Sequence, residues 1–182
     1  MTRTDEALHV LRAQSGDRAA VDALFQHVQA PLFRCIEGIV GQRELAEDVL
    51  QEVFLILYRK LAWLREPKLF RPWAYRIASR EAVRAARRRY HLVHDEEALD
   101  SLPDPSTPDP ITSQMAARLP ELVAHVPPAS RAVLTLYYLE EMRLPEVAAV
   151  LGVSLGTVKS RLAYGLAKLR LEFDVKPTRR KR

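Results

Sequence analysis

The sequence predicts an all-α protein built from two small helical domains that are joined by a flexible, acidic, proline-rich linker. Nearly every segment carries helical spacing of apolar residues, and no sustained period-two alternation argues for a sheet. Near the C-terminus, two short apolar-periodic segments are joined by Gly152-Val153-Ser154, which is the spacing of a helix-turn-helix. We therefore expect a helical domain over 1–93, a linker over 94–112, a helix-turn-helix domain over 113–174 and a basic tail over 175–182.

Four helices are expected in the N-terminal domain: from Asp17 to Pro31, from Leu32 to Gly41, from about 44 to 64, and from about 70 to 90. Asp17 is a suitable N-cap, and Pro31 is expected to stop the first helix. Gly41 favours the end of the second helix. The third is expected to be the longest in the chain, and Pro72 is tolerated in the first turn of the fourth.

The linker stands out by composition, because His94 to Pro110 contains four prolines and several acids but no Lys or Arg. Such a segment buries too little apolar surface to offset chain entropy. After it, one helix is expected to begin at Thr112 or Ser113 and another at Pro127-Pro128, followed by the helix-turn-helix.

In the helix-turn-helix, Gly152 is expected to end the first helix and Ser154 to cap the second. An inward stripe is predicted on the second helix, formed by Val158, Leu162, Leu166 and Leu169. Small, polar and cationic side chains then face outward, which suits a major groove lined by phosphates and base edges. The alternative is a helical hairpin whose polar face only meets water. Gly165 is expected to soften this helix, since glycine in an exposed helix interior costs about 1 kcal/mol.

Charge and composition narrow the function classes. Lys and Arg number 28 against 23 Asp and Glu, a formal net charge of +5, so a polyanionic partner is expected, either nucleic acid or an anionic membrane surface. No apolar run is long enough to cross a bilayer, so a soluble cytoplasmic protein without membrane insertion is expected. The single cysteine, Cys35, is expected to be a small buried side chain.

No catalytic pattern is present, and we expect neither an enzyme nor a cofactor. The sequence lacks a phosphate-cradling glycine loop, a His-Glu-x-x-His pair and a nucleophile elbow. His91 and His94 are three residues apart, but no third ligand lies nearby, so no metal site is expected.

Two blocks of sequence resemble one family. PPASRAVLTLYYLEEMRLPEVAAVLGVSLGTVKSRL resembles region 4 of bacterial RNA polymerase sigma factors. AEDVLQEVFLILYRKL, followed by FRPWAYRIASREAVRAARRR, resembles region 2, and a linker in place of region 3 resembles the extracytoplasmic-function group. The resemblance implies a factor that binds core RNA polymerase, recognises promoter DNA and promotes strand opening. Its implied partners are core RNA polymerase, promoter DNA and an anti-sigma factor, and the free protein is expected to be a monomer.

The resemblance also implies three groups of site residues. Polymerase binding is expected at Asp48, Gln51 and Glu52, which share one helix face, although an ordinary solvated face has the same pattern. Minus-ten DNA is expected to contact the loop cations, the first aromatic residues of the fourth helix and its arginines: Arg65, Lys68, Trp73, Tyr75, Arg76, Arg80 and Arg84. Trp73 is equally suited to the core. The minus-thirty-five element is expected to contact Thr157, Lys159, Ser160, Arg161 and Tyr164.

Three residues depart from the family pattern. Many relatives carry Asn where this chain has Arg80, Asp where it has Arg84 and Arg where it has Tyr164. The promoter sequence that relatives recognise therefore cannot be assigned to this chain. Two other classes stay open: an adaptor that binds polymerase or a sigma inhibitor without initiating transcription, and a dimeric helix-turn-helix regulator that occupies an operator.

Overall fold

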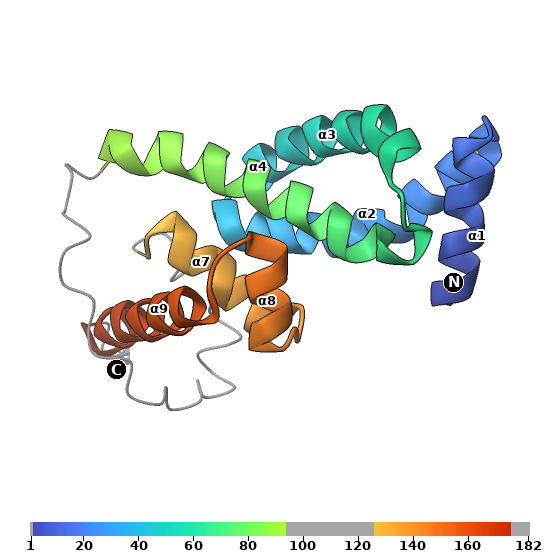
Figure 1. Ribbon diagram of the computed structural model, residues 1–182. Coiled ribbons are helices and arrows are strands. Elements are labelled where there is room, and N and C mark those ends of the chain that lie inside the picture. The colour runs from blue at the N-terminus through green and yellow to red at the C-terminus, as the bar shows by residue number, and fades with distance from the viewer. Residues whose placement is uncertain (1, 94–125, 176–182) are drawn as a thin grey trace, which may run out of the picture.

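The computed structural model describes residues 2–93 and 126–175, and within these two stretches every regular element is helical (Figure 1). The linker expected over 94–112, the helix expected after Thr112 and residues 176–182 of the tail lie outside the described residues. The elements are α1 (Arg3–Gln14), α2 (Arg18–Val40), α3 (Arg43–Lys60), the short helices η1 (Leu61–Trp63) and η2 (Pro67–Leu69), α4 (Phe70–Val93), α7 (Pro128–Leu134), the π-helical turn η4 (Thr135–Leu139), α8 (Leu144–Leu151) and α9 (Leu155–Val175).

Helix α2 lies at the centre of the N-terminal half and contacts α1, α3 and α4 (Figure 1). Its ends follow local rules. Asp17 is the N-cap, with Oδ1 accepting a hydrogen bond from the Ala20 amide at 3.1 Å. Gly41 ends the helix with a left-handed φ of 75°, a conformation that glycine adopts without strain.

The expected stop at Pro31 is wrong, because α2 runs unbroken from Arg18 to Val40 with Pro31 inside it. Proline removes one backbone hydrogen bond, but the buried side chains Val28 and Leu32 on either side continue one packed stripe. Tertiary burial along the whole stripe therefore outweighs the local preference to stop.

Helix α3 is also shorter than expected. It ends at Lys60, and Leu61–Trp63 form a 3-10 turn. The Gln14 side-chain amide donates to the carbonyls of Leu61 and Leu64, both at 2.9 Å, and so holds this turn from α1. The longest described helix is α4, with 24 residues.

The helix-turn-helix is confirmed in the C-terminal half. Gly152 follows α8 with a φ of 67°, and the Ser154 Oγ caps α9 by accepting from the Thr157 amide at 3.1 Å. The inward stripe of α9 is buried as expected, with Val158, Leu162, Leu166 and Leu169 at most 2% exposed.

Gly165 does not lie in an exposed position, so the expected softening of α9 is wrong. The residue is buried against α7, where an added Cβ would lie 2.8 Å from the Leu134 Cδ1 atom. Gly165 thus permits a close approach of α7 and α9 that any larger residue would obstruct.

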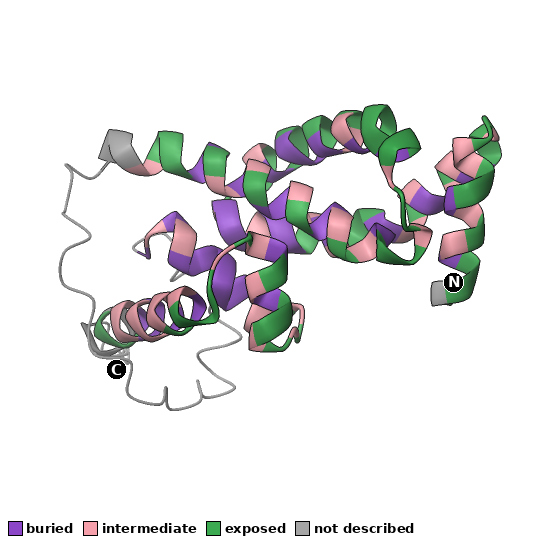
Figure 2. Cartoon of the chain, viewed as in Figure 1, coloured by how far each residue is buried: buried purple, intermediate pink, exposed green. Residues whose placement is uncertain are grey.

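The two halves pack on each other. Helix α4 contacts α7 and α8, while α2 contacts α7 and η4. Buried side chains of both halves form one continuous cluster, and the purple segments of Figure 2 meet where the halves join. Cys35 belongs to this cluster and is fully buried, as expected.

Candidate nucleic-acid interface

The residues expected to bind polymerase lie together on the outer side of α3. Asp48, Gln51 and Glu52 are all exposed, while Val49, Val53 and other residues of the opposite face are buried. The sequence analysis missed Leu55 and Tyr58, which are 57% and 59% exposed. Their spacing of seven and ten residues from Asp48 places them on the same face and is the signal that would have found them. We call Asp48, Gln51, Glu52, Leu55 and Tyr58 the α3 surface.

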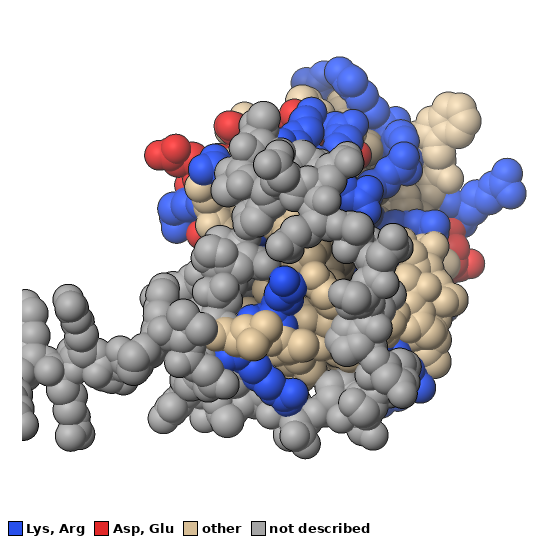
Figure 3. All heavy atoms as spheres, turned by 90° about the vertical axis from the view of Figure 1, so that its left-hand side faces the viewer, with Lys and Arg blue, Asp and Glu red and all other residues tan. Residues whose placement is uncertain are grey.

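The arginines of α4 form an exposed row along the helix, made of Arg76, Arg80, Arg84, Arg87 and Arg88. Figure 3, viewed from the side on which α4 ends, shows Lys and Arg side chains gathered over the upper part of the molecule. Arg84 lies 2.6 Å from a Glu81 carboxylate oxygen and 3.7 Å from one of Glu52. Arg84 therefore connects the arginine row to the α3 surface. Like charges at helical spacing repel each other, and a polyanion relieves that repulsion.

A surface hollow of about 620 Å³ lies where α3 ends and α4 begins, lined by Arg59, Lys60, Trp63, Leu64, Arg65 and Trp73. Of the expected minus-ten residues, Arg65 and Trp73 line it, whereas Lys68 is exposed on η2 outside the lining. Arg59, Lys60 and Trp63 were missed. Trp63 is 82% exposed and therefore contributes little to the core. Cations beside flat aromatic rings suit the phosphates and the unstacked bases of single-stranded nucleic acid.

Trp73 packs partly against the core and also borders the hollow, and its contact with DNA stays a prediction. Its ring packs 6.1 Å from that of Phe70, between centroids, and it also lines the hollow.

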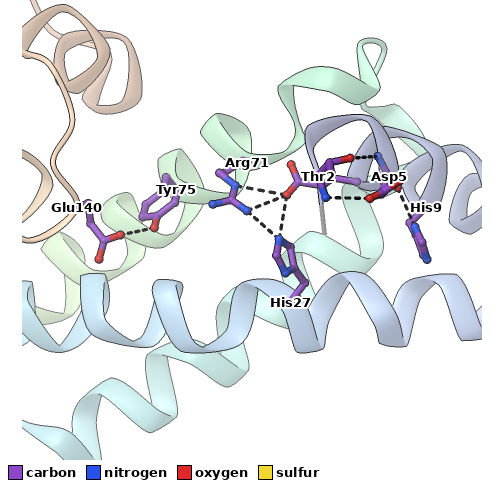
Figure 4. Close-up of polar contacts among 8 residues, drawn as sticks. Thr2, Asp5, His9, His27, Arg71, Tyr75 and Glu140 are labelled. Atoms are coloured by element: carbon purple, nitrogen blue, oxygen red, sulfur yellow. Dashed lines mark hydrogen bonds and ion pairs between the residues drawn. The ribbon is translucent and has the colours of Figure 1, made fainter.

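Tyr75 occupies a different place from the one expected. Its side chain is 4% exposed, and its hydroxyl donates a hydrogen bond to Glu140 of the C-terminal half (Figure 4). Burial and the Glu140 carboxylate raise the pKa of Tyr75, so the phenol keeps its proton. A base cannot stack on this ring while the halves are packed, because Glu140 and the surrounding core cover it.

Two of the outward residues of α9 form hydrogen bonds within the first turns of the same helix. Thr157 is held by Ser154, with their hydroxyl oxygens 2.8 Å apart, and the Ser160 hydroxyl donates to the carbonyls of Gly156 and Thr157 at 3.1 Å. Lys159 is exposed, and the Lys168 ammonium lies 5.8 Å from the centre of the Tyr164 ring.

Arg161 of α9 is half-buried. Burial first, and then the charge of Arg87, lower its pKa. The helix-turn-helix contacts α4 through α8.

A partly buried polar cluster ties α1 to the other N-terminal helices (Figure 4). Arg71 of α4 lies 3.2 Å from the Glu6 carboxylate and 2.8 Å from His27 Nε2. Burial and the Arg71 charge lower the pKa of His27, so the neutral ring accepts this hydrogen bond. The cluster anchors α1, whose Gln14 in turn holds the turn beside the hollow.

Residues 2–93 and 126–175 offer neither a metal site nor a membrane-spanning helix. These residues contain no group of three His, Cys, Asp or Glu side chains arranged to hold a metal ion. None of their helices has the length and apolar character that spanning a membrane would require.

Two family descriptions match the chain in the expected order. Residues 24–91 match Sigma-70 region 2, and residues 116–169 match Sigma-70, region 4. The first contains the α3 surface, the hollow and the whole arginine row, and the second contains the helix-turn-helix.

Curated relatives give the same assignment. ECF RNA polymerase sigma factor SigE of Mycolicibacterium smegmatis is 32% identical over 86% of this chain, which spans 63% of that protein's length. RNA polymerase sigma-H factor of Pseudomonas aeruginosa is 30% identical over 89% of this chain and 90% of its own length. ECF RNA polymerase sigma-E factor of Haemophilus influenzae is 30% identical over 87% of this chain and 89% of its own length.

Solved structures share the fold across both halves. CnrH, solved in complex with the cytosolic domain of CnrY, aligns with a TM-score of 0.68 at 23% identity and covers 94% of this chain and 99% of its own. RpoE of Bartonella quintana, solved with the anti-sigma factor NepR, aligns with a TM-score of 0.60 at 18% identity and covers 86% of this chain and 98% of its own. From the two matched regions and the relatives that align along nearly their whole length, the chain belongs to the sigma-70 family of RNA polymerase sigma factors, in its extracytoplasmic-function group.

Proposed function

We propose that this protein is a sigma factor that binds core RNA polymerase, recognises promoter DNA and promotes strand opening at the start of transcription. The observation that carries the proposal is the presence, in one chain, of a helix-turn-helix and of an arginine-rich helix whose first turn borders an aromatic hollow. The helix-turn-helix is suited to duplex DNA, and the arginine-rich helix with its hollow is suited to a melted strand. The protein acts in the cytoplasm and needs no catalytic activity of its own.

The minus-ten element is assigned to the hollow and the arginine row. A base extracted from the duplex loses stacking worth a few kcal/mol, which Trp63 and Trp73 offset by offering flat apolar faces. Arg59, Lys60 and Arg65 lie around the same hollow and attract the flanking phosphates, with Lys68 nearby on η2. Arg76, Arg80 and Arg84 continue the contact with the backbone along α4.

The minus-thirty-five element is assigned to α9, whose N-terminal turn enters the major groove. Lys159 is the exposed cation for phosphate contact, while Thr157 and Ser160 offer hydroxyl oxygens that accept from base edges. Arg161 and Tyr164 are partly covered and extend the contact when the groove is engaged.

Core polymerase is assigned to the α3 surface. Carboxylates flanked by exposed apolar side chains suit a basic partner helix with an apolar stripe, because the charges steer association and the apolar groups supply burial. An anti-sigma factor is the other proposed protein partner, since CnrH and RpoE were each solved with a partner protein, NepR being an anti-sigma factor. The free chain is proposed to be a monomer.

Run-off transcription with purified core polymerase on fragmented genomic DNA tests the proposal. We expect transcripts that start at defined positions only when this protein is added. Stable binding to core without any promoter-dependent transcript would favour the adaptor. Operator binding by a dimer in the absence of core, measured by light scattering and gel shift, would favour the regulator.

A further inference from the structure

The hollow is lined by two segments of chain that must be held at a fixed distance from each other. Trp63 and Leu64, in the turn after α3, contribute to its lining, and so does Trp73 in the first turns of α4. The position of the turn relative to α4 therefore sets the space between the two tryptophan side chains. A flat base fits only if that space is kept constant.

Trp63 has little side-chain packing that could fix its position, because it is 82% exposed. Its place depends instead on the backbone of η1 and of Leu64, which ends the turn in an extended conformation with a φ of −72° and a ψ of 101°. Binding groups need to be held within about 0.5 Å of their productive positions by supporting hydrogen bonds. The backbone of this turn is therefore where support is required.

Gln14, the last residue of α1, supplies this support. Its side-chain amide nitrogen lies 2.9 Å from the carbonyl oxygen of Leu61 and 2.9 Å from that of Leu64, and donates to both. The carbonyls at the end of a helical segment have no partner within the helix, and the glutamine amide has two N–H hydrogens to offer. One side chain thus holds the backbone on each side of Trp63.

Helix α1 is itself attached to the start of α4. Glu6 is 3% exposed, and its carboxylate lies 3.2 Å from Arg71, two residues before Trp73. Figure 1 shows α1 beside the connection from α3 to α4, and α1 contacts both short helices of that connection. Through Glu6 and Gln14, α1 links the segment that carries Trp73 to the turn that carries Trp63.

Apolar packing alone does not explain the contacts of Gln14. Val10 of α1 and Leu61 of η1 are both buried in the apolar core, and burial of such side chains supplies most of the stability. The hydrophobic effect has no direction, so it leaves the backbone conformation of the turn poorly defined. Hydrogen bonds depend on distance and angle, so the two from Gln14 define that conformation.

We propose that Gln14 is a positioning residue for capture of the minus-ten strand, because its hydrogen bonds to the Leu61 and Leu64 carbonyls set the place of Trp63 in the hollow. This inference rests on the proposed function. Gln14 acts through the turn and does not itself contact DNA. Its loss should therefore weaken strand capture but spare the binding of core polymerase and of the minus-thirty-five element.

Two variants of the full-length protein remove these hydrogen bonds with little change of shape. Gln14→Met keeps the length of the side chain but has no N–H donor. Gln14→Asn keeps the amide but is one CH₂ group shorter, so it cannot reach both carbonyls. Gln29→Met makes the same exchange as the first variant at an exposed position of α2 and is the matched control.

Hydrogen exchange of the Leu64 amide in the free protein measures whether the turn is held. This amide donates to the Leu61 carbonyl at 3.1 Å and so closes the turn. We expect Q14M and Q14N to speed its exchange at least fivefold, because opening the turn no longer breaks the bonds to Gln14. Q29M should exchange like the wild type.

Strand capture is measured with holoenzyme and a promoter that carries 2-aminopurine in the non-template minus-ten strand. Both Gln14 variants should weaken capture at least fivefold, while their affinities for core polymerase and for a minus-thirty-five duplex stay within twofold of the wild type. In a Trp63→Ala background, Q14M should cause less than a twofold further loss, because no ring is left to position. A role in stability alone would give the same loss in both backgrounds.

The outcomes separate this inference from the proposed function. If Q14M and Q14N capture the strand as well as Q29M does, if their exchange at Leu64 is unchanged, or if the full loss persists without Trp63, the positioning role is refuted while the sigma-factor proposal stands. If the wild type with core polymerase captures no melted strand, the proposed function fails and this inference fails with it. Circular dichroism shows whether each variant is folded, and if Q14M unfolds, Q14N decides.

Discussion

Gly165 of α9 lies directly against Leu134 of α7, whose Cδ1 atom is 2.8 Å from the position that a Cβ would occupy; the Ser130 Cβ lies 3.3 Å away. Gly165→Ala would gain about 1 kcal/mol of helix propensity but would overpack a buried contact, at a cost of about 1–3 kcal/mol. We expect a net loss of about 1 kcal/mol in the free energy of unfolding, measured by urea denaturation.

Gly156→Ala is the matched control on the same helix. A Cβ there meets only Ser154 Oγ at 3.7 Å, an ordinary contact. Its stability should equal or exceed that of the wild type by up to about 1 kcal/mol. Equal stability of the two alanine variants would contradict the close-packing role of Gly165.

Features that depend on residues close together in the sequence could be predicted, whereas features that depend on distant residues could not. Asp17, Gly152 and Ser154 were placed correctly because a cap depends on a few neighbouring residues. The stripe of α9 followed from helical periodicity alone. By contrast, the continuity of α2 through Pro31 depends on packing along its whole length, which no local rule measures.

Contacts between distant residues explain the remaining differences. Gly165 was expected at the surface because nothing in its own helix indicates that α7 crosses there. Tyr75 was expected to face DNA because its family position suggested it, whereas its partner Glu140 lies 65 residues away. Trp63 was not predicted as a site residue, because a single aromatic residue in a turn belongs to no periodic pattern. In the structure it lines the hollow and its side chain is largely exposed.

The Tyr75–Glu140 contact predicts a pH dependence. Burial raises the pKa of Glu140 above its usual value near 4.5, while Tyr75, Arg34 and Arg71 act in the opposite direction. The folded protein therefore binds the Glu140 proton more tightly than the unfolded chain does. This stabilisation is fully present below about pH 4.5 and is lost as the pH rises through the raised pKa.

Glu140→Gln isolates this effect, because its amide oxygen still accepts from Tyr75 but carries no charge to desolvate. The variant should be more stable than the wild type at pH 8, by about 1 kcal/mol, and the difference should shrink towards pH 5. Thermal unfolding at both pH values measures it. Other groups that titrate in this range, such as His27, affect both proteins equally. Their contribution therefore drops out of the difference in stability between the variant and the wild type. A constant difference across this range would show that the pKa of Glu140 is the same in the folded and unfolded protein.

Reversing charge on the α3 surface tests its assignment to core polymerase. Asp48→Lys should weaken binding to core at least tenfold, and adding Glu52→Lys should abolish it, because like charges then face a basic partner. Both positions are exposed, so the fold should persist. Asp22→Lys makes the same charge change at an exposed position of α2 and should bind normally. Full affinity of the double variant in a pull-down with core would remove the assignment.

The hollow predicts a base-stacking role for Trp63. Trp63→Ala should leave stability unchanged, because the side chain is 82% exposed, but should weaken capture of the melted strand by about 1–3 kcal/mol, or roughly 5- to 150-fold. Fluorescence of 2-aminopurine in the non-template minus-ten strand, with holoenzyme, measures it. Leu69→Ala removes another exposed side chain of the same connection outside the hollow and should behave as the wild type. Equal effects of the two variants would exclude stacking on Trp63.

The exposure of Lys159 predicts how α9 holds DNA. If its ammonium contacts a phosphate, Lys159→Ala should lower affinity for a minus-thirty-five duplex and reduce the slope of log K against log salt concentration by about one unit, because one fewer counterion is released. Arg161→Ala should act similarly but more weakly, because the Arg161 side chain is half-buried. Arg18→Ala also removes an exposed cation, but from the first turn of α2, and should leave the slope unchanged. Fluorescence anisotropy over a salt series measures the slopes. Affinities that fall without any change of slope would assign Lys159 to base edges instead of the backbone, while unchanged affinity and slope would take it out of the interface.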